Sequence, residues 1–317
     1  MAADDSSQPL ASLDALPAAV GAVAHRLVHG GRRFRDPVLV DDEVARRLAA
    51  LSDLAPLHTR PALAALAEAR AKLPHLPHVA VFDTAFHATI PDEAATYALP
   101  RRVRDEWGIR RFGFHGLSVQ WAAERVPAPR LVVCHLGGGC SVTAVRDGRS
   151  VDTSMGFTPL EGVPMATRPG SVDPGALLYL LKHRLTLAEL EQMLEHESGL
   201  LGLGGSDDPR RLEGSGALAV YTYRIAAAVG AAAVALDGLD ALVFTAGVGE
   251  GSARVRADIC ARLGFLGLRL DDERNLAARP DADVAAPGSS VRVVVLRARE
   301  DVVAARAARA LLRLDEG

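Results

Sequence analysis

The sequence is poor in lysine, aromatic residues and cysteine. Of its 36 basic residues only Lys72 and Lys182 are lysines, and neither lies in a glycine-rich loop, which excludes a P-loop. Aromatic residues make up 4% of the chain and the formal net charge is -3. These values argue against a stacking surface or a basic face for nucleic acid. The three cysteines form no C-x-x-C pair, which indicates reduced thiols in a cytosolic protein.

Long apolar runs are also missing. The longest, from Ile225 to Leu236, has 12 residues and is rich in alanine, so it is too short to cross a bilayer and predicts a buried helix. The first residues, MAADDSSQPL, have neither the basic nor the apolar region of a secretory signal. We therefore expect a cytoplasmic protein with no membrane partner and no nucleic-acid partner.

The 317 residues are enough for about two domains, and 49% of them are apolar. Residues 1–20 predict a frayed lead-in with one short helix near residues 10–16. Beyond it, the apolar pattern predicts strands at 78–82, 130–135, 241–245 and 291–296, a hairpin around Asp147-Gly148, a glycine-rich loop at 198–209, and helices at 41–54, 61–72, 174–184, 186–196, 214–236, 252–263 and 300–314. This alternation of strands and helices indicates an α/β protein.

Two glycine-rich segments follow buried strands. They are HLGGG at residues 135–139 and GVGEGS at residues 247–252. Glycines let backbone N–H groups approach an anion closely, and Ser252 would open a helix whose N-terminus favours phosphate. One such loop alone is more often a tight turn, but two at the carboxyl ends of strands indicate a nucleotide cleft.

Several polar residues stand beside glycines or at the ends of elements. Arg26 and Arg168 lie in loop-like surroundings, where a guanidinium can bind a carboxylate or phosphate through two hydrogen bonds. Each candidate also has an ordinary explanation: a solvated charge for either arginine, a helix N-cap for Asp83, a buried structural histidine for His115 or His87, and a favourable acid at a helix start for Glu300. The sequence contains neither an H-E-x-x-H motif nor a G-x-S-x-G elbow.

Eight motifs, in this order, resemble the acetokinase family of carboxylate kinases. They are HRLVHGG, VFDTAFHATIP, YALP, RRFGFHGLS, HLGGGCS, DTSMGFTPLEGVPMATRPGSVDP, SGLLGLGGSDDPR and FTAGVGEGS, and the resemblance extends from about Val20 to Leu314. It implies a duplicated RNase-H-like fold, shared with sugar kinases and actin, with the active site between two lobes. Residues 21–86 and 301–317 would form a partial N-terminal lobe, and residues 87–300 a complete C-terminal nucleotide-binding lobe.

The resemblance also implies a reaction and a homodimer formed through the C-terminal lobe. The γ-phosphoryl group of ATP would pass to acetate, giving acetyl phosphate and ADP, reversibly and with Mg²⁺. Arg26 would bind the substrate carboxylate, Asp83 would be the active-site acid or base residue, His115 and Arg168 would stabilise the transition state, and Glu300 would bind the metal. ATP would contact His135, Leu136, Gly137, Gly138, Gly139, Asp208, Pro209, Arg210, Gly247, Val248, Gly249, Glu250 and Gly251.

The sequence departs from the family pattern in two ways. The opening N-x-G-S-S-S-x-K strand and its neighbours, roughly 50 residues, have no counterpart here, so we expect a first lobe truncated at its N-terminus with an exposed sheet edge. Gly138 and Gly251 stand where the family usually has Asn, and Ala166 stands where it usually has Gly. The alternatives are a propionate or butyrate kinase, a catalytically impaired nucleotide-binding member, or a misassigned start.

Overall fold

The computed structural model describes residues 5, 7, 13, 16, 20–51 and 56–313, without the side chains of 56–58. Within it the chain forms two compact units. Unit 1 comprises Met1–Ala88, Phe114–Trp121 and Arg299–Gly317, and unit 2 comprises Thr89–Gly113 and Ala122–Ala298. Residues 114–121 thus belong to unit 1, whereas the resemblance assigned them to the C-terminal lobe; the lobe boundaries themselves stay a prediction. Apart from single positions, the expected lead-in and its short helix lie outside the described residues.

Unit 1 is built on a three-stranded sheet in the order β1-β3-β2. Strand β1 (Val23–Leu27) runs parallel to the central strand β3 (His78–Phe82), and β2 (Val38–Leu39) runs antiparallel to it. All five residues of β3 are buried, as expected for a strand covered on both faces. Arg26 lies within β1, so the loop-like surroundings predicted for it are wrong.

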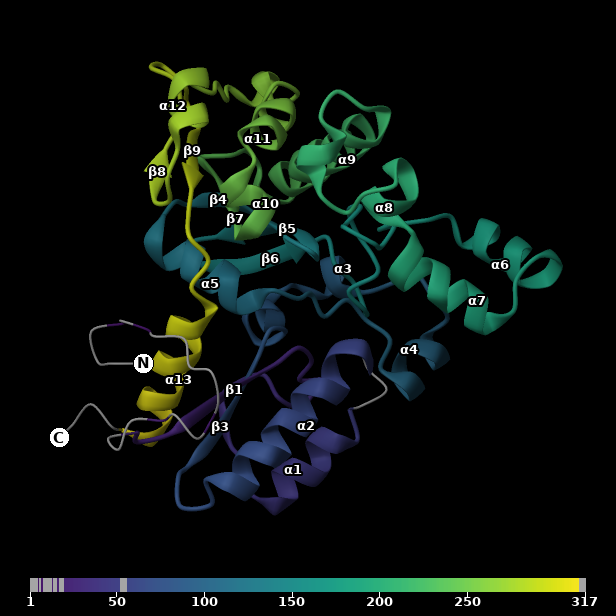
Figure 1. The fold of residues 1–317 in the computed structure, drawn as a ribbon, viewed down its shortest axis with the longest axis vertical. Coiled ribbons are helices and arrows are strands. Elements are labelled where there is room, and N and C mark those ends of the chain that lie inside the picture. Colours follow the sequence, from purple (N-terminus) through teal and green to yellow (C-terminus); the bar gives the residue numbers. More distant parts are fainter. Residues whose placement is uncertain are drawn as a thin grey trace. The chain divides into compact units, whose positions relative to one another are not determined.

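Among the described residues of unit 1, three whole helices lie beside the sheet (Figure 1). Helix α1 (Asp42–Ala49) begins where Asp41 accepts the backbone N–H of Val44, an N-cap bond. Helix α2 (Pro56–Lys72) packs on β1, and α13 (Glu300–Leu312) packs on β1 and β3. The core of the unit consists of Leu27, Phe34, Val40, Leu48, Leu66, Ala80 and Phe82.

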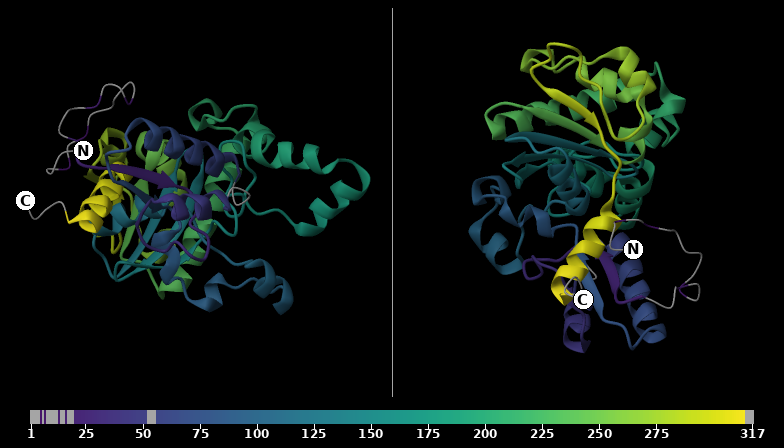
Figure 2. Two further views of the ribbon diagram at one scale, coloured as in Figure 1. Left: turned by 90° about the horizontal axis from the view of Figure 1, so that it is seen from below. Right: turned by 90° about the vertical axis from the view of Figure 1, so that its left-hand side faces the viewer.

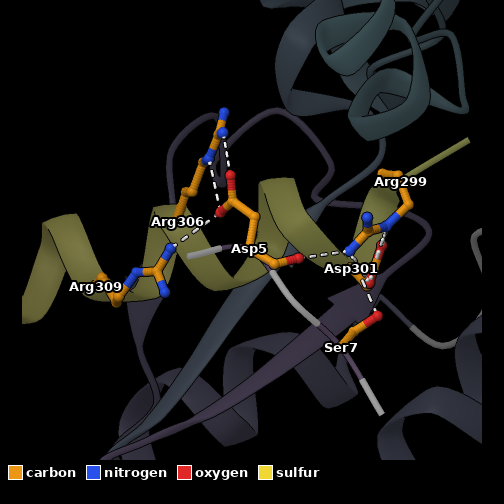
Figure 3. Close-up of polar contacts among 6 residues, drawn as sticks. All are labelled: Asp5, Ser7, Arg299, Asp301, Arg306 and Arg309. Carbon is orange, nitrogen blue, oxygen red and sulfur yellow. Dashed lines mark hydrogen bonds and ion pairs between the residues drawn. The ribbon is translucent and has the colours of Figure 1, made fainter. Parts of the chain in front are cut away.

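Asp5 ties the described part of the N-terminal segment to α13 (Figure 3). Its carboxylate forms an ion pair with Arg306 and accepts a hydrogen bond from Arg309 Nη2 at 3.3 Å. Arg299 Nη2 donates to the backbone carbonyl of Asp5 at 2.8 Å. The hydrogen bond from Arg306 lowers the pKa of the Asp5 carboxyl. This favours the carboxylate form of Asp5 beside the arginines of α13.

Unit 2 contains a six-stranded sheet in the order β6-β5-β4-β7-β9-β8. The strands are β4 (Arg130–Leu136), β5 (Cys140–Arg146), β6 (Arg149–Thr153), β7 (Ala241–Thr245), β8 (Ala282–Asp283) and β9 (Arg292–Val295). Strands β4, β7 and β9 are parallel, and the other pairs are antiparallel. The predicted hairpin between β5 and β6 is confirmed, with Asp147 and Gly148 both at positive φ (48° and 77°), as a type I′ turn requires.

Helices and short turns surround this sheet, and Figure 2 shows α6 and α7 as a hairpin. Their bounds are α3 (Asp92–Ala95), α4 (Arg101–Trp107), α6 (Pro174–His183), α7 (Leu187–Gln192), α8 (Gly199–Gly204), α9 (Gly216–Leu236), α10 (Ala246–Gly251), α11 (Ala253–Cys260) and α12 (Asp272–Ala277). Helix α5 (Gly116–Arg125) runs from residues of unit 1 into residues of unit 2. The segment η3 (Met193–Glu197) is a π-helix, and η4 (Pro209–Leu212) and η5 (Gly264–Leu266) are 3-10 helices. A further 3-10 helix, η2 (Ala85–Thr89), begins in unit 1.

Helix α9 is the central helix of unit 2. By length and composition alone it could cross a membrane, but half of its most apolar stretch is buried inside the protein. Tyr221, Ile225 and Val229 are fully buried, and the helix packs on β4 and β5. It is the buried helix that the apolar run at Ile225 to Leu236 predicts.

Two glycine-rich segments are helical where the sequence predicted loops. Helix α8 lies in the stretch expected as a loop at residues 198–209, and α10 covers the GVGEG segment. In α8, Leu200 is buried and its backbone N–H donates to Met165 O at 2.9 Å. Glycine has a low helix propensity, which tertiary contacts override in both segments.

Candidate active site

Unit 1 brings Arg26, Asp83 and Glu300 together. Asp83 follows β3 directly, and its backbone N–H donates to Leu27 O at 3.0 Å, which places its side chain beside Arg26 on β1. Arg26 binds both carboxylate oxygens of Asp83, Nε to Oδ1 at 3.0 Å and Nη2 to Oδ2 at 2.7 Å. Its Nη1 donates to Glu300 Oε2, at the start of α13, at 2.6 Å. One guanidinium therefore links two acids that the chain places far apart.

Burial and ion pairing act in opposite directions on this cluster. Asp83 is only 1% exposed, so burial raises the pKa of its carboxyl, and the charge and hydrogen bonds of Arg26 oppose that rise. Burial likewise raises the pKa of Glu300, again opposed by Arg26. Burial acts against the charged form of Arg26, but the attraction of Asp83 outweighs it and raises the pKa of the guanidinium. The cluster thus places a permanent cation between two acids.

The same cluster fits a divalent cation. Glu300 Oε1 is buried and has no hydrogen-bond partner among the described residues. Together with Asp83 it offers two carboxylates, the hard oxygen ligands that Mg²⁺ prefers. No group of three or more His, Cys, Asp or Glu side chains suited to a metal occurs in the described part of the chain. This small ligand set suits Mg²⁺, which often binds one or two carboxylates and completes its shell with water and substrate phosphate.

His115 lies beside Asp83 through its backbone. Its N–H donates to the Asp83 carboxylate, and the next residue, Gly116, donates to Asp83 O at 2.9 Å. A Cβ on Gly116 would lie 2.1 Å from Asp83 O, so only glycine permits this approach. His115 itself adopts φ 61°, an uncommon backbone conformation for a residue with a side chain.

His87 is the structural histidine of this region. It is 3% exposed, and its Nε2 lies 2.9 Å from the carbonyl oxygen of Phe114, the residue before His115. Burial lowers the pKa of His87 to about 4, so the ring is neutral at pH 7 and Nε2 carries the donated proton. His87 therefore supports the backbone that carries His115.

Unit 2 brings the two glycine-rich segments together. They follow β4 and β7, which are adjacent and parallel, with His135 opposite Thr245. A Cβ on Gly137 would lie 3.5 Å from Cβ of Ala246, the first residue of α10. The prediction that both segments lie at the carboxyl ends of strands is confirmed, and the structure adds that these strands are neighbours.

Arg168 is connected to the first of these segments through its own loop. The backbone N–H of Ala166 donates to Gly138 O at 3.2 Å. The side chain of Arg168 is 13% exposed, and its Nε lies 3.3 Å from Glu195 Oε2. The loop that carries Arg168 therefore adjoins the glycines, while its guanidinium pairs with an acid of η3.

Pro209 and Arg210 open a separate turn, η4, which packs on α9, and Asp208 is its N-cap. Asp208 Oδ1 accepts the backbone N–H of Arg210 at 3.0 Å, and the two side chains form an ion pair at 2.8 Å. Both bonds join residues of the turn to each other. They therefore do not connect the turn with the two glycine-rich segments.

Sequence reasoning missed Arg256 on α11. Its side chain is 2% exposed, and its Nη1 donates to the carbonyl oxygens of Gly249 and Glu250, both at 2.9 Å. One signal could have found it: Arg256 shares a helical face with Ile259 and Cys260, both of which are buried.

Comparisons with known proteins agree with one another. A family model described as the Acetokinase family matches residues 9–306. An acetate kinase of Nostoc punctiforme is 45% identical over 301 residues, covering 89% of this chain and 74% of that protein. An acetate kinase of Gloeobacter violaceus is 46% identical over 310 residues, covering 92% and 76%.

Solved structures give the same result. A propionate kinase from Francisella tularensis superposes with a TM-score of 0.86 at 36% identity, covering 90% of this chain and 78% of that one. The acetate kinase of Porphyromonas gingivalis superposes with a TM-score of 0.86 at 37% identity, covering 92% and 78%.

Proposed function

The chain belongs to the acetokinase family, whose duplicated RNase-H-like fold it shares, and we propose that it is an acetate kinase. The reaction transfers the γ-phosphoryl group of ATP reversibly to acetate, giving acetyl phosphate and ADP. The observation that carries the proposal is the cluster in which Arg26 binds Asp83 and Glu300. The guanidinium of Arg26 can bind a small carboxylate. The carboxylates of Asp83 and Glu300 beside it can bind a metal ion.

Arg26 binds the substrate carboxylate in this proposal. A guanidinium has five N–H donors, and the described bonds to Asp83 and Glu300 use three of them. A small carboxylic acid has a pKa of about 4–5 and is ionised at pH 7, so it needs no base to become a nucleophile. Asp83 therefore acts by orienting Arg26 and by its charge, in place of the acid or base role that the resemblance implied.

Glu300 and Asp83 are the residues that would hold Mg²⁺. When bound, the ion neutralises charge on the transferred phosphoryl group. His115 and Arg168 add positive or hydrogen-bonding groups for the transition state. Residues 135–139, 208–210 and 247–251 bind ATP, and glycines in two of these segments permit close contact between phosphate and backbone N–H groups.

The direct test is a hydroxamate assay for acetyl phosphate with the purified chain, ATP, Mg²⁺ and acetate. We expect turnover by the natural chain and a loss of at least about 100-fold for Arg26→Ala, because truncation removes the carboxylate ligand. A chain that binds ADP but produces no acetyl phosphate would be the impaired nucleotide-binding member, and the proposal would be wrong.

A propionate or butyrate kinase is the second candidate. It is favoured by one observation: the Francisella tularensis propionate kinase superposes on this chain with the same TM-score, 0.86, as the Porphyromonas gingivalis acetate kinase. Rates with acetate, propionate and butyrate at equal concentrations separate the two, and a higher kcat/KM for a longer acid would replace acetate as the substrate.

We also propose a cytoplasmic homodimer formed through the C-terminal lobe. Its support is the family membership and the few, reduced cysteines, all of which are buried. Light scattering on the purified chain should give twice the chain mass of 33.4 kDa. A monomer at micromolar concentration would contradict the dimer.

A further inference from the structure

Arg256 is a buried cation whose described hydrogen-bond acceptors are all neutral. Besides Gly249 O and Glu250 O, its guanidinium donates to Asn275 twice, from Nε to Oδ1 at 2.7 Å and from Nη2 to the backbone oxygen at 2.8 Å. Burying a charge without a counter-ion is unfavourable unless strong hydrogen bonds compensate. Arg256 thus joins its own helix, α11, to α10 on one side and to α12, which carries Asn275, on the other.

Helix α10 depends on contacts from outside itself. It has six residues, AGVGEG, of which three are glycine, and neither this length nor this composition supports an independent helix. At its start, Glu250 Oε1 accepts the backbone N–H of Ala246 at 3.1 Å and that of Ala298 at 2.9 Å. At its end, Arg256 binds two carbonyl groups of the last turn, where intrahelical partners are lacking and a positive charge is favourable.

We propose that Arg256 is a positioning residue of the nucleotide site, holding α10 in the shape in which residues 247–251 meet ATP. The inference rests on the proposed function, which assigns that segment to ATP. Arg256 is itself buried and acts through the backbone of α10. Because Ala246 lies against Gly137 of the other glycine-rich segment, a displaced α10 also disturbs residues 137–139.

The test compares Arg256→Lys and Arg256→Met with Arg254→Gln. Arg254 is the matched control, since it lies on the same helix but is 54% exposed and pairs with Asp258. For each protein we would measure KM for ATP, KM for acetate and kcat, and the Kd of ADP by calorimetry. Lysine keeps the charge but lacks the planar fork of donors, so we expect Arg256→Lys to raise KM for ATP and Kd for ADP roughly tenfold.

The other parameters distinguish positioning from a purely structural role. We expect Arg256→Met to raise the Kd of ADP further than Arg256→Lys, with KM for acetate changed less than about twofold in both and with Arg254→Gln unchanged in every parameter. A residue needed only for folding would lower the active fraction, and therefore kcat, at unchanged KM for ATP and unchanged Kd. That pattern would overturn the inference.

A third variant, Asn275→Ala, covers the case in which neither Arg256 variant folds. It removes one acceptor of the guanidinium but keeps the cation, and we expect a rise of about threefold in the Kd of ADP. An unchanged Kd in Asn275→Ala would then decide against the inference. If the natural chain does not bind ADP, the proposed function fails and the inference with it. If the natural chain binds ADP and the variants bind it equally well, the inference alone fails.

Discussion

Asp83 is a side chain on which we expect both stability and activity to depend. It is buried, binds Arg26 through both oxygens and accepts the backbone N–H of His115. We expect Asp83→Asn to lower kcat by about 100-fold or more. The amide offers Arg26 one acceptor oxygen in place of two and lacks the negative charge of the carboxylate. Since a carboxylate that is 1% exposed no longer pairs with Arg26, the free energy of unfolding should fall by about 3 kcal/mol.

Asp42→Asn is the control for that variant. Asp42 pairs with Arg70 on the surface, where the Asp42 side chain is 92% exposed. We therefore expect Asp42→Asn to change the free energy of unfolding by less than about 0.5 kcal/mol and to leave kcat unchanged. Urea unfolding and the hydroxamate assay measure both quantities. If Asp83→Asn kept full kcat, Asp83 would be dispensable for the reaction.

Gly138 allows a gain-of-function prediction. A Cβ there would meet nothing within 4 Å, and its φ lies outside the left-handed region, so a side chain fits without strain. We expect Gly138→Asn to restore the amide usual in the family and to lower KM for ATP roughly threefold, a typical value for one added hydrogen bond. Steady-state kinetics measure this effect. Gly138→Ala is the control, and an increased KM for ATP in the asparagine variant would contradict the prediction.

At the scale of elements, α13 connects the N-terminal segment with the candidate site. Asp5 pairs with Arg306, two turns beyond Glu300 on the same helix. We expect the effects of Asp5→Asn and Arg306→Gln on the urea midpoint to be non-additive, because each variant removes the same ion pair. The coupling should weaken in 0.5 M salt, which screens exposed charges.

Fully additive effects at low salt would show that this pair contributes nothing to stability. The cycle is needed because Arg306 also lies over the ring of Trp121, at 5.6 Å from the centroid, and a single substitution loses that contact too. Comparing the double variant with both single variants isolates the interaction between Asp5 and Arg306.

Much of the element pattern could be predicted from the sequence, and each failure has a physical cause. The strands β3, β4 and β7 were predicted because continuous apolar runs are typical of buried strands. Strand β1 was missed because His25 and Arg26 interrupt its apolar character. Helix α10 was missed because Arg256 of α11 holds its last turn from outside, and local propensity contains no information about such a contact.

For the candidate site, the resemblance identified Arg26, Asp83 and Glu300, and the structure groups them. No local pattern predicts that grouping, because Arg26 and Glu300 are 274 residues apart in the chain. The roles of these residues, and those of His115 and Arg168, stay predictions until variants are assayed.

At the scale of the whole molecule, His87 makes stability depend on pH. Its pKa is about 4 in the folded protein, against 6.5 for the unperturbed side chain. The unfolded chain therefore binds the extra proton first, and stability is fully present above pH 6.5 and lost as the pH falls toward 4. Between pH 7 and pH 5 the loss from His87 should be about 2 kcal/mol.

His87→Gln tests this dependence, because glutamine still offers an N–H for Phe114 O but does not titrate. We expect the fall in the free energy of unfolding between pH 7 and pH 5 to be smaller in His87→Gln than in the natural chain by about 2 kcal/mol, the contribution of His87. His196→Gln, at an exposed histidine, is the control for the substitution of histidine by glutamine. An equal pH dependence in His87→Gln and the natural chain would contradict the prediction.

Unit 1 is built from separate segments of the chain, so its folding depends on the order in which the chain is synthesised. Its last segment, Arg299–Gly317, supplies α13, which packs on β1 and β3, and Glu300, which pairs with Arg26. A chain emerging from the ribosome releases β1 and β3 long before α13, so unit 1 stays incomplete until all of unit 2 has been translated. We expect the face of the sheet that α13 later covers to be open to chaperones or to self-association during that interval, and the acid cluster can assemble only after Glu300 has been released.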